Sequence, residues 1–214
     1  NNLKARNIFR TVTSEVLDGS DLNTKIINIH IEEKPTGEIT LAAGVGTEGG
    51  TMGFSISENN FMGRGVKLSA ELRVSEDTIR GNFTTYNPNY NYSGKALSTN
   101  IQSTVTDKMA DRGYDSTKTG FSFGTSVEQY EDLFFKPSFS TYYEKLTTND
   151  SASANLKNQE GSYFDTTFGY SFDYDKRNQK WQTTEGYRSK FTQRVPLISE
   201  NYALLNGYEI AKYI

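Results

Sequence analysis

Apolar and polar residues alternate along most of the chain from residue 38 onward. The clearest example is the segment 66–75, in which Val66, Leu68, Ala70, Leu72 and Val74 are separated by polar residues. A period of two places the apolar side chains on one face of a β-strand and the polar ones on the other. The pattern recurs at residues 39–45, 52–56, 66–74, 79–85, 97–105, 121–127, 133–143, 164–172, 187–195 and 202–213. The sequence therefore predicts an all-β antiparallel sheet of about ten strands.

The first 36 residues have a different organisation. Leu3, Ala5 and Ile8 have near-helical spacing, and two strands are expected at 9–16 and 25–32, joined by a turn at 17–21. So short a unit cannot bury a core of its own, which indicates that the rest of its domain lies upstream.

A domain boundary is expected at the joint around Pro35 and Gly37. Proline cannot donate a ladder hydrogen bond and glycine is conformationally permissive, so the joint ends one sheet before the next begins. The predicted domains are residues 1–36 and residues 37–214.

Alternation alone does not distinguish a soluble β-sandwich from a membrane barrel. Two features favour the barrel: the strands approach the ten or so residues that a tilted membrane strand needs, and charges lie on only one face of them. The connection at 128–132 is short, whereas 107–119 and 147–161 look long and polar, which suggests short turns on one side and long loops on the other. Aromatic residues near predicted strand ends would suit a membrane girdle: Phe61, Tyr86, Tyr90, Tyr92, Tyr130, Tyr163, Tyr174, Trp181 and Tyr202.

Composition limits the chemistry. The 214 residues carry a net charge of −3, contain no cysteine and include one histidine, His30. The mixed charges argue against nucleic-acid binding, and the absence of cysteine excludes disulfides and thiolate sites. His30 lies on the polar side of its strand, where a solvated side chain is expected. Asp173, Asp175 and Asn178 resemble a calcium loop only faintly, because the required glycine and glutamate are misplaced. We therefore expect no enzyme activity, no metal and no cofactor.

Several motifs together resemble the Omp85 superfamily, and within it the BamA-type assembly factors of the outer membrane. These motifs are EEKPTG at 32–37 with AGVGTEGG at 43–50, ENNFMGRG at 58–65, YNPNY at 86–90, and DKRN at 175–178 with TTEGYR at 183–188. Such turns need glycine for positive φ and Asn or Asp to bond their own backbone.

This resemblance implies a transmembrane antiparallel β-barrel of sixteen strands in the bacterial outer membrane. The chain would supply about the first ten strands, preceded by the C-terminal part of an α+β POTRA domain in the periplasm. Family members assemble and insert other β-barrels, so the implied partners are the outer-membrane lipid bilayer, unfolded β-barrel clients and accessory periplasmic lipoproteins.

The resemblance also implies a working site without catalytic side chains. In the family the first and last barrel strands meet at a weak lateral seam, and client strands pair with the exposed edge of the first strand. The edge residues here would be Glu38, Ile39, Thr40, Leu41, Ala42, Ala43, Gly44, Val45, Gly46 and Thr47. The first periplasmic turn would contain Asn59, Asn60, Phe61, Gly63 and Gly65.

Other functions are open at this point. A translocation or two-partner secretion pore belongs to the same superfamily, and a passive porin, a lipid-modifying barrel enzyme or a soluble adhesin would lie outside it. An enzyme would need a convergent catalytic set. The charges expected on the polar face indicate a solvated lumen wall rather than a selective site: Lys67, Glu71, Arg73, Arg80, Arg188, Lys190 and Arg194.

Overall fold

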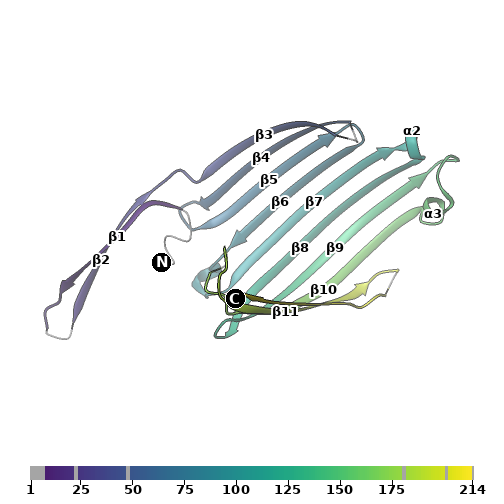
Figure 1. Ribbon diagram of the computed structural model, residues 1–214. Coiled ribbons are helices and arrows are strands. Elements are labelled where there is room, and N and C mark those ends of the chain that lie inside the picture. The colour runs from purple at the N-terminus through teal and green to yellow at the C-terminus, as the bar shows by residue number, and fades with distance from the viewer. Residues whose placement is uncertain (1–7, 22–23, 47–48, 180–181, 201, 214) are drawn as a thin grey trace.

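A computed structural model describes residues 8–21, 24–46, 49–179, 182–200 and 202–213 of the chain. Within these residues the fold is a two-stranded hairpin followed by a large antiparallel sheet (Figure 1). The predicted helical residues Leu3 and Ala5 lie outside the described part.

The N-terminal hairpin consists of β1 (Phe9–Asp18) and β2 (Lys25–Glu33). Val12 lies opposite Ile31 and Val16 opposite Ile27, so one face is largely apolar, as the alternation predicts. The two predicted strands are confirmed, with a small difference at the turn: β1 continues through Asp18, where the turn was expected to have begun.

Ten strands form the second sheet, in the order β12-β11-β10-β9-β8-β7-β6-β5-β4-β3, and each neighbouring pair is antiparallel. The strands are β3 (Gly37–Gly46), β4 (Gly49–Phe61), β5 (Val66–Ser75), β6 (Thr78–Asn87), β7 (Ala96–Lys108), β8 (Tyr114–Tyr130), β9 (Leu133–Thr148), β10 (Gly161–Asp175), β11 (Gly186–Ile198) and β12 (Leu205–Tyr213). The short helices are η1 (Tyr90–Tyr92), α2 (Met109–Arg112) and α3 (Ala154–Lys157). The predicted all-β antiparallel sheet of about ten strands is confirmed.

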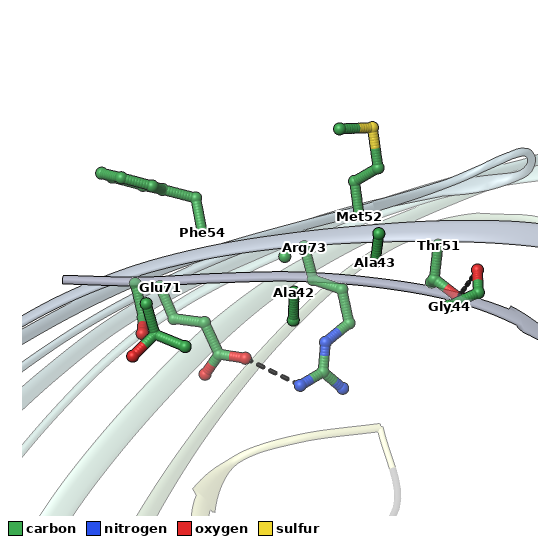
Figure 2. A pocket seen from close by; sticks show the side chains of 11 residues that line it. Ala42, Ala43, Gly44, Thr51, Met52, Phe54, Glu71 and Arg73 are labelled. Atoms are coloured by element: carbon green, nitrogen blue, oxygen red, sulfur yellow. Dashed lines mark hydrogen bonds and ion pairs between the residues drawn. The ribbon is translucent and has the colours of Figure 1, made fainter.

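The ten-stranded sheet is strongly curved and open, with β3 at one edge and β12 at the other (Figure 1). We call the end near the β1–β2 hairpin the hairpin end and the opposite end the far end. The curvature gives the sheet a convex and a concave face. Figure 2 shows Met52 and Phe54 on one face and Glu71 and Arg73 on the other, which is the concave side.

Apolar side chains lie on the outside of this sheet rather than in a core. Val45 is 91% exposed and Ile101 is 50% exposed, although both belong to the regular apolar row. Among the described residues, the buried hydrophobic side chains are Ile8, Ala96, Leu146 and Ala152. A soluble sandwich would cover its apolar rows with a second sheet, whereas a membrane barrel turns them toward lipid.

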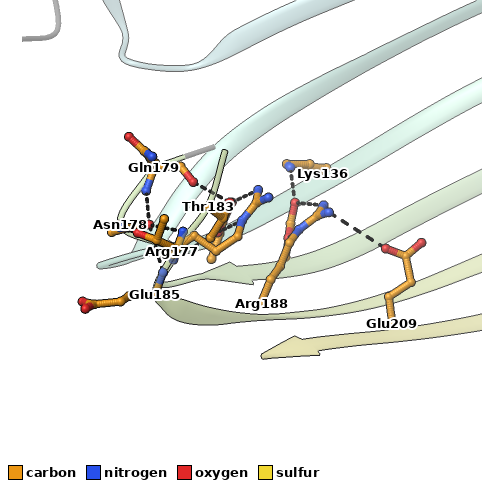
Figure 3. A network of polar contacts seen from close by, with 11 residues as sticks. Lys136, Arg177, Asn178, Gln179, Thr183, Glu185, Arg188 and Glu209 are labelled. Atoms are coloured by element: carbon orange, nitrogen blue, oxygen red, sulfur yellow. Dashed lines mark hydrogen bonds and ion pairs between the residues drawn. The ribbon is translucent and has the colours of Figure 1, made fainter. Parts of the chain in front are cut away.

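The concave face carries paired charges, concentrated at the hairpin end of β9 to β12 (Figure 3). Asp173 is only 4% exposed and accepts hydrogen bonds from Lys136 Nζ at 2.6 Å and from Arg188 Nε and Nη2 at 2.8 and 2.9 Å. Arg188 Nη1 also lies 3.9 Å from Glu209 Oε2 on β12. One carboxylate thus joins β9, β10 and β11, and Arg188 extends the network to β12.

The connections do not follow the predicted asymmetry. At the far end β5 and β6 are joined by residues 76–77, whereas residues 176–185 form a long connection between β10 and β11 at the hairpin end. The expected short turn at 128–132 and the long loop within 147–161 are present.

The predicted loop at 107–119 is wrong. β7 runs to Lys108, a single helical turn follows, and β8 begins at Tyr114, with Asp107 paired to Asp115. This hairpin is polar on both faces, so it lacks the alternation by which a strand is recognised in sequence.

Candidate functional site

Strand β3 is the first strand of the large sheet and lies at its edge. It pairs with β4 on one side, and within the described residues no strand lies on its other side. All ten of its residues are exposed. A free strand edge presents a row of backbone donors and acceptors that another strand can pair with. The structure thus brings residues 38–46 of the predicted edge together in one accessible ladder; Thr47 lies outside the described part.

The two halves of the β3–β4 pairing differ in their side chains. Toward the hairpin end, Ile39 lies opposite Ile56 and Leu41 opposite Phe54. Toward the far end each pair contains at least one glycine or alanine: Ala42–Gly53, Ala43–Met52, Gly44–Thr51, Val45–Gly50 and Gly46–Gly49. These small residues leave an open hollow of about 410 Å³ beside Glu71 and Arg73. Figure 2 shows the residues that line it. The far half of β3 is therefore held mainly by its backbone.

The β4–β5 turn has the predicted chemistry but is shorter than expected. Gly63 and Gly65 have φ values of +69° and +66°, the left-handed region that glycine adopts without strain. Asn60 Oδ1 accepts a hydrogen bond from Gly65 N at 2.7 Å. Asn59, Asn60 and Phe61 belong to the end of β4 rather than to the turn, because β4 continues through a bulge between Glu58 and Phe61.

Residues of that bulge reach across to the joint between the hairpin and β3. Asn59 donates both its backbone N–H and its side-chain amide to the carbonyl oxygen of Thr36, each at 3.3 Å. The carboxylate of Glu58 accepts hydrogen bonds from the Thr36 hydroxyl and from Asn60 N. We call Thr36, Glu58 and Asn59 the clasp. It fixes the point at which the chain enters β3.

The sequence motif points to Asn59 as a site residue, whereas the roles of Glu58 and Thr36 emerge only from the structure. A signal was present in the pattern. Met52, Phe54 and Ile56 form the apolar row of β4, and Glu58 stands at the next position of that row. A charge at an apolar position of a strand indicates a specific partner, which here is the Thr36 hydroxyl.

The other candidates have structural roles. His30 is exposed on β2 opposite Thr13. Asp173 and Asp175, considered above for calcium, are engaged by Lys136, Arg188 and Arg177. The hydrogen bonds that Arg177 donates to the Asp175 carboxylate raise the pKa of the Arg177 guanidinium. In the described ranges, no group of three or more His, Cys, Asp or Glu side chains is placed to hold a metal ion. The helices in those ranges are all too short or too polar to span a bilayer.

Asn178 organises the β10–β11 turn. Its side-chain oxygen accepts hydrogen bonds from the backbone of Gln179 and Thr184, and its amide donates to the Thr184 hydroxyl at 2.7 Å. This confirms that the DKRN and TTEG motifs form one turn closed by asparagine.

A model of the Omp85 superfamily domain matches residues 60–208, which is more than half of the chain. The chain belongs to the Omp85 superfamily. This match runs from the end of β4 into β12, so it covers the turn and most of the sheet but not β3. No curated protein sequence matches this Omp85 chain.

Two solved structures share the fold. BamA from Haemophilus ducreyi lacking POTRA domains 1–3 matches with a TM-score of 0.70 at 20% identity, over 100% of this chain and 44% of that one. CdiB from Acinetobacter baumannii matches with a TM-score of 0.55 at 10% identity, over 97% of this chain and 41% of that one. At such identities the likeness shows the fold alone. The Omp85 chain spans less than half the length of either structure.

Proposed function

We propose that this Omp85 chain is the first part of an outer-membrane β-barrel that inserts other β-barrel proteins, with β3 as the edge that pairs with client strands. The observation that carries the proposal is the position of β3, which follows the hairpin directly and has one side of its ladder free within the described residues. Backbone pairing suits a site that accepts many client sequences, because it does not depend on particular side chains.

The exposed apolar rows support the membrane part of this proposal. Outward-facing Phe121, Phe168 and Phe172 are each at least 38% exposed, while the concave face carries the paired charges. This distribution matches a lipid-facing exterior and a wet lumen. On this proposal the hairpin end faces the periplasm, and β1 and β2 are the C-terminal part of a POTRA domain spanning residues 1–36.

The remaining partners follow from the same proposal. The barrel would comprise sixteen strands, of which this chain contributes ten, and accessory periplasmic lipoproteins would bind the upstream domains. Accordingly, we propose no catalytic residue and no cofactor.

A cysteine pair in the full-length parent protein tests the proposal. One cysteine replaces Ala43, which is exposed on β3, and the second is placed on the last barrel strand; this part of the chain has no cysteine of its own. Crosslinking should stop insertion of a client barrel into liposomes, and reduction should restore it. A cysteine pair replacing Ile56 and Ala70, which face each other on β4 and β5, is the control and should leave insertion unchanged when oxidised.

A secretion pore of the same superfamily is the alternative, because the fold match to CdiB covers nearly the whole chain. Such a pore moves its substrate through the lumen, so sealing the seam would leave transport intact. Client insertion that continues with the seam crosslinked would refute the edge mechanism and favour the pore.

A further inference from the structure

We propose that Glu58 is a positioning residue for β3, and that the clasp makes the strand open from its far end while its hairpin end stays fixed. This inference rests on the proposed function, since it describes how the same edge is controlled. It concerns the pairing of β3 with β4 rather than the seam with the last strand.

The two halves of β3 differ in the side chains that they pair with β4. At the hairpin end, Phe54 and Ile56 of β4 lie opposite Leu41 and Ile39 and are 39% and 43% exposed. Leu41 and Ile39, on the free edge, are themselves 79% and 68% exposed. At the far end Met52 is 69% exposed and Val45 is 91% exposed, so their side chains contact little. A Cβ atom added at Gly44 or Gly46 would meet nothing within 4 Å. The half near the hairpin therefore pairs larger side chains across β3 and β4, and side-chain packing resists opening more there than in the far half.

The clasp holds the entrance to β3 against the end of β4. The bulge in β4 releases Asn59 and Asn60 from the β4–β5 ladder, and their backbone groups turn to Thr36 and Glu58. The Glu58 carboxylate of β4 then accepts a hydrogen bond from the Thr36 hydroxyl at the entrance to β3, and the backbone N–H of Asn60, also on β4, holds this carboxylate in place. A hydrogen bond to an ionised group is stronger than a neutral one, so the contact between Thr36 and Glu58 resists separation more than a neutral hydrogen bond would.

The joint between the hairpin and β3 fits closely against Glu58. A Cβ atom built on Gly37 would lie 3.3 Å from Glu58 Oε2, so the first residue of β3 has no spare room beside the carboxylate. The clasp thus sets both the position and the register of the strand. A client strand would meet an edge that is fixed at the hairpin end and compliant at the far end.

Hydrogen exchange of the full-length protein in liposomes, without client, tests this inference. In the wild-type protein the amides of residues 43–46 that donate to β4 should exchange at least about tenfold faster than those of residues 38–41, because local opening governs exchange. Glu58→Ala should accelerate exchange at 38–41 by about tenfold, the factor expected from losing a hydrogen bond to a charged group. It should leave 43–46 unchanged, since that half does not depend on the clasp.

Conservative variants separate positioning from general stability. Glu58→Gln keeps an oxygen acceptor for Thr36 and Asn60, so exchange at 38–41 should return to within about threefold of wild type, as expected for a neutral hydrogen bond. Glu144→Ala removes a carboxylate on β9 that is paired with Lys118 on β8, far from the clasp in the strand order, and it should not change hydrogen exchange in β3. If Glu58→Ala does not insert into membranes, Thr36→Val removes the hydroxyl alone and should still accelerate exchange at 38–41.

Equal exchange of the two halves in the wild-type protein would overturn the inference. So would unaltered exchange at 38–41 in both Glu58→Ala and Thr36→Val, or acceleration throughout the sheet. These results are separable from the fate of the proposed function. If the two halves of β3 exchange equally but the seam crosslink still blocks client insertion, the role of the clasp is refuted and the edge mechanism stands. If β3 shows the expected exchange profile but the crosslink has no effect on insertion, the edge mechanism is refuted and the role of the clasp stands.

Discussion

The contact between Gly120 and Tyr142 on the concave face gives a quantitative prediction. The two residues are direct partners of β8 and β9, and the Tyr142 ring lies across the glycine. A Cβ atom at Gly120 would lie 2.1 Å from Cδ1 and 2.4 Å from Cε1 of this ring. Ordinary contacts begin near 3.4 Å, so Gly120→Ala must displace the ring by more than 1 Å.

The expected cost of Gly120→Ala is about 2 kcal/mol of unfolding free energy, in the range for overpacking a filled site. Displacing the ring also disturbs its contact with Lys118, whose Nζ lies 5.6 Å from the ring centroid. Gly81→Ala is the matched control, because a Cβ there meets nothing within 4 Å. That variant should stay within about 0.5 kcal/mol of wild type.

A double-mutant cycle tests the assigned cause. In a Tyr142→Ala background the clash is gone, so adding Gly120→Ala should cost less than about 0.5 kcal/mol, which leaves a coupling of about 1.5 kcal/mol between the two sites. Urea unfolding of the full-length protein in detergent micelles, followed by intrinsic fluorescence and by the migration of unboiled samples on gels, measures these free energies. Equal costs for Gly120→Ala in both backgrounds, or for Gly120→Ala and Gly81→Ala, would refute the steric argument.

Two further predictions use the same unfolding assay. Asp173→Ala should lower stability by about 2–3 kcal/mol, because it leaves partly buried Lys136 and Arg188 without their carboxylate. Glu144→Ala breaks a more exposed pair and should cost at most about 1 kcal/mol, so similar costs for both would contradict the role given to burial. Gly63→Ala should cost about 1 kcal/mol through its φ of +69° alone, since the space around a Cβ is open, and Gly63→Asn should cost less because asparagine tolerates this region. A neutral Gly63→Ala would show that the turn adopts another conformation.

Local sequence rules were sufficient to predict the strands with a regular apolar row. Val66 to Val74 and Phe164 to Phe172 alternate cleanly, because each such strand places its apolar side chains on one face of the sheet and its polar ones on the other. The same rules located the glycines at 63 and 65 and the asparagines that close their turns, since φ and local hydrogen bonding are properties of short segments. They failed at 107–119, where both faces of the hairpin are polar and no alternation marks the strands.

The tertiary structure decided what depends on distant pairs of residues. Thr36 and Glu58 are 22 positions apart, and only the β3–β4 register and the bulge in β4 bring the hydroxyl to the carboxylate. Asp173 has an ordinary sequence context, and its burial follows from Lys136 on β9 and Arg188 on β11 converging on it from both sides. The sequence by itself determined that the chain is a meander of alternating strands, because alternation is a local consequence of a two-sided environment. Which carboxylate anchors a network, and which strand has a free edge, are consequences of register and sheet order, and these are set by contacts between residues far apart in the chain.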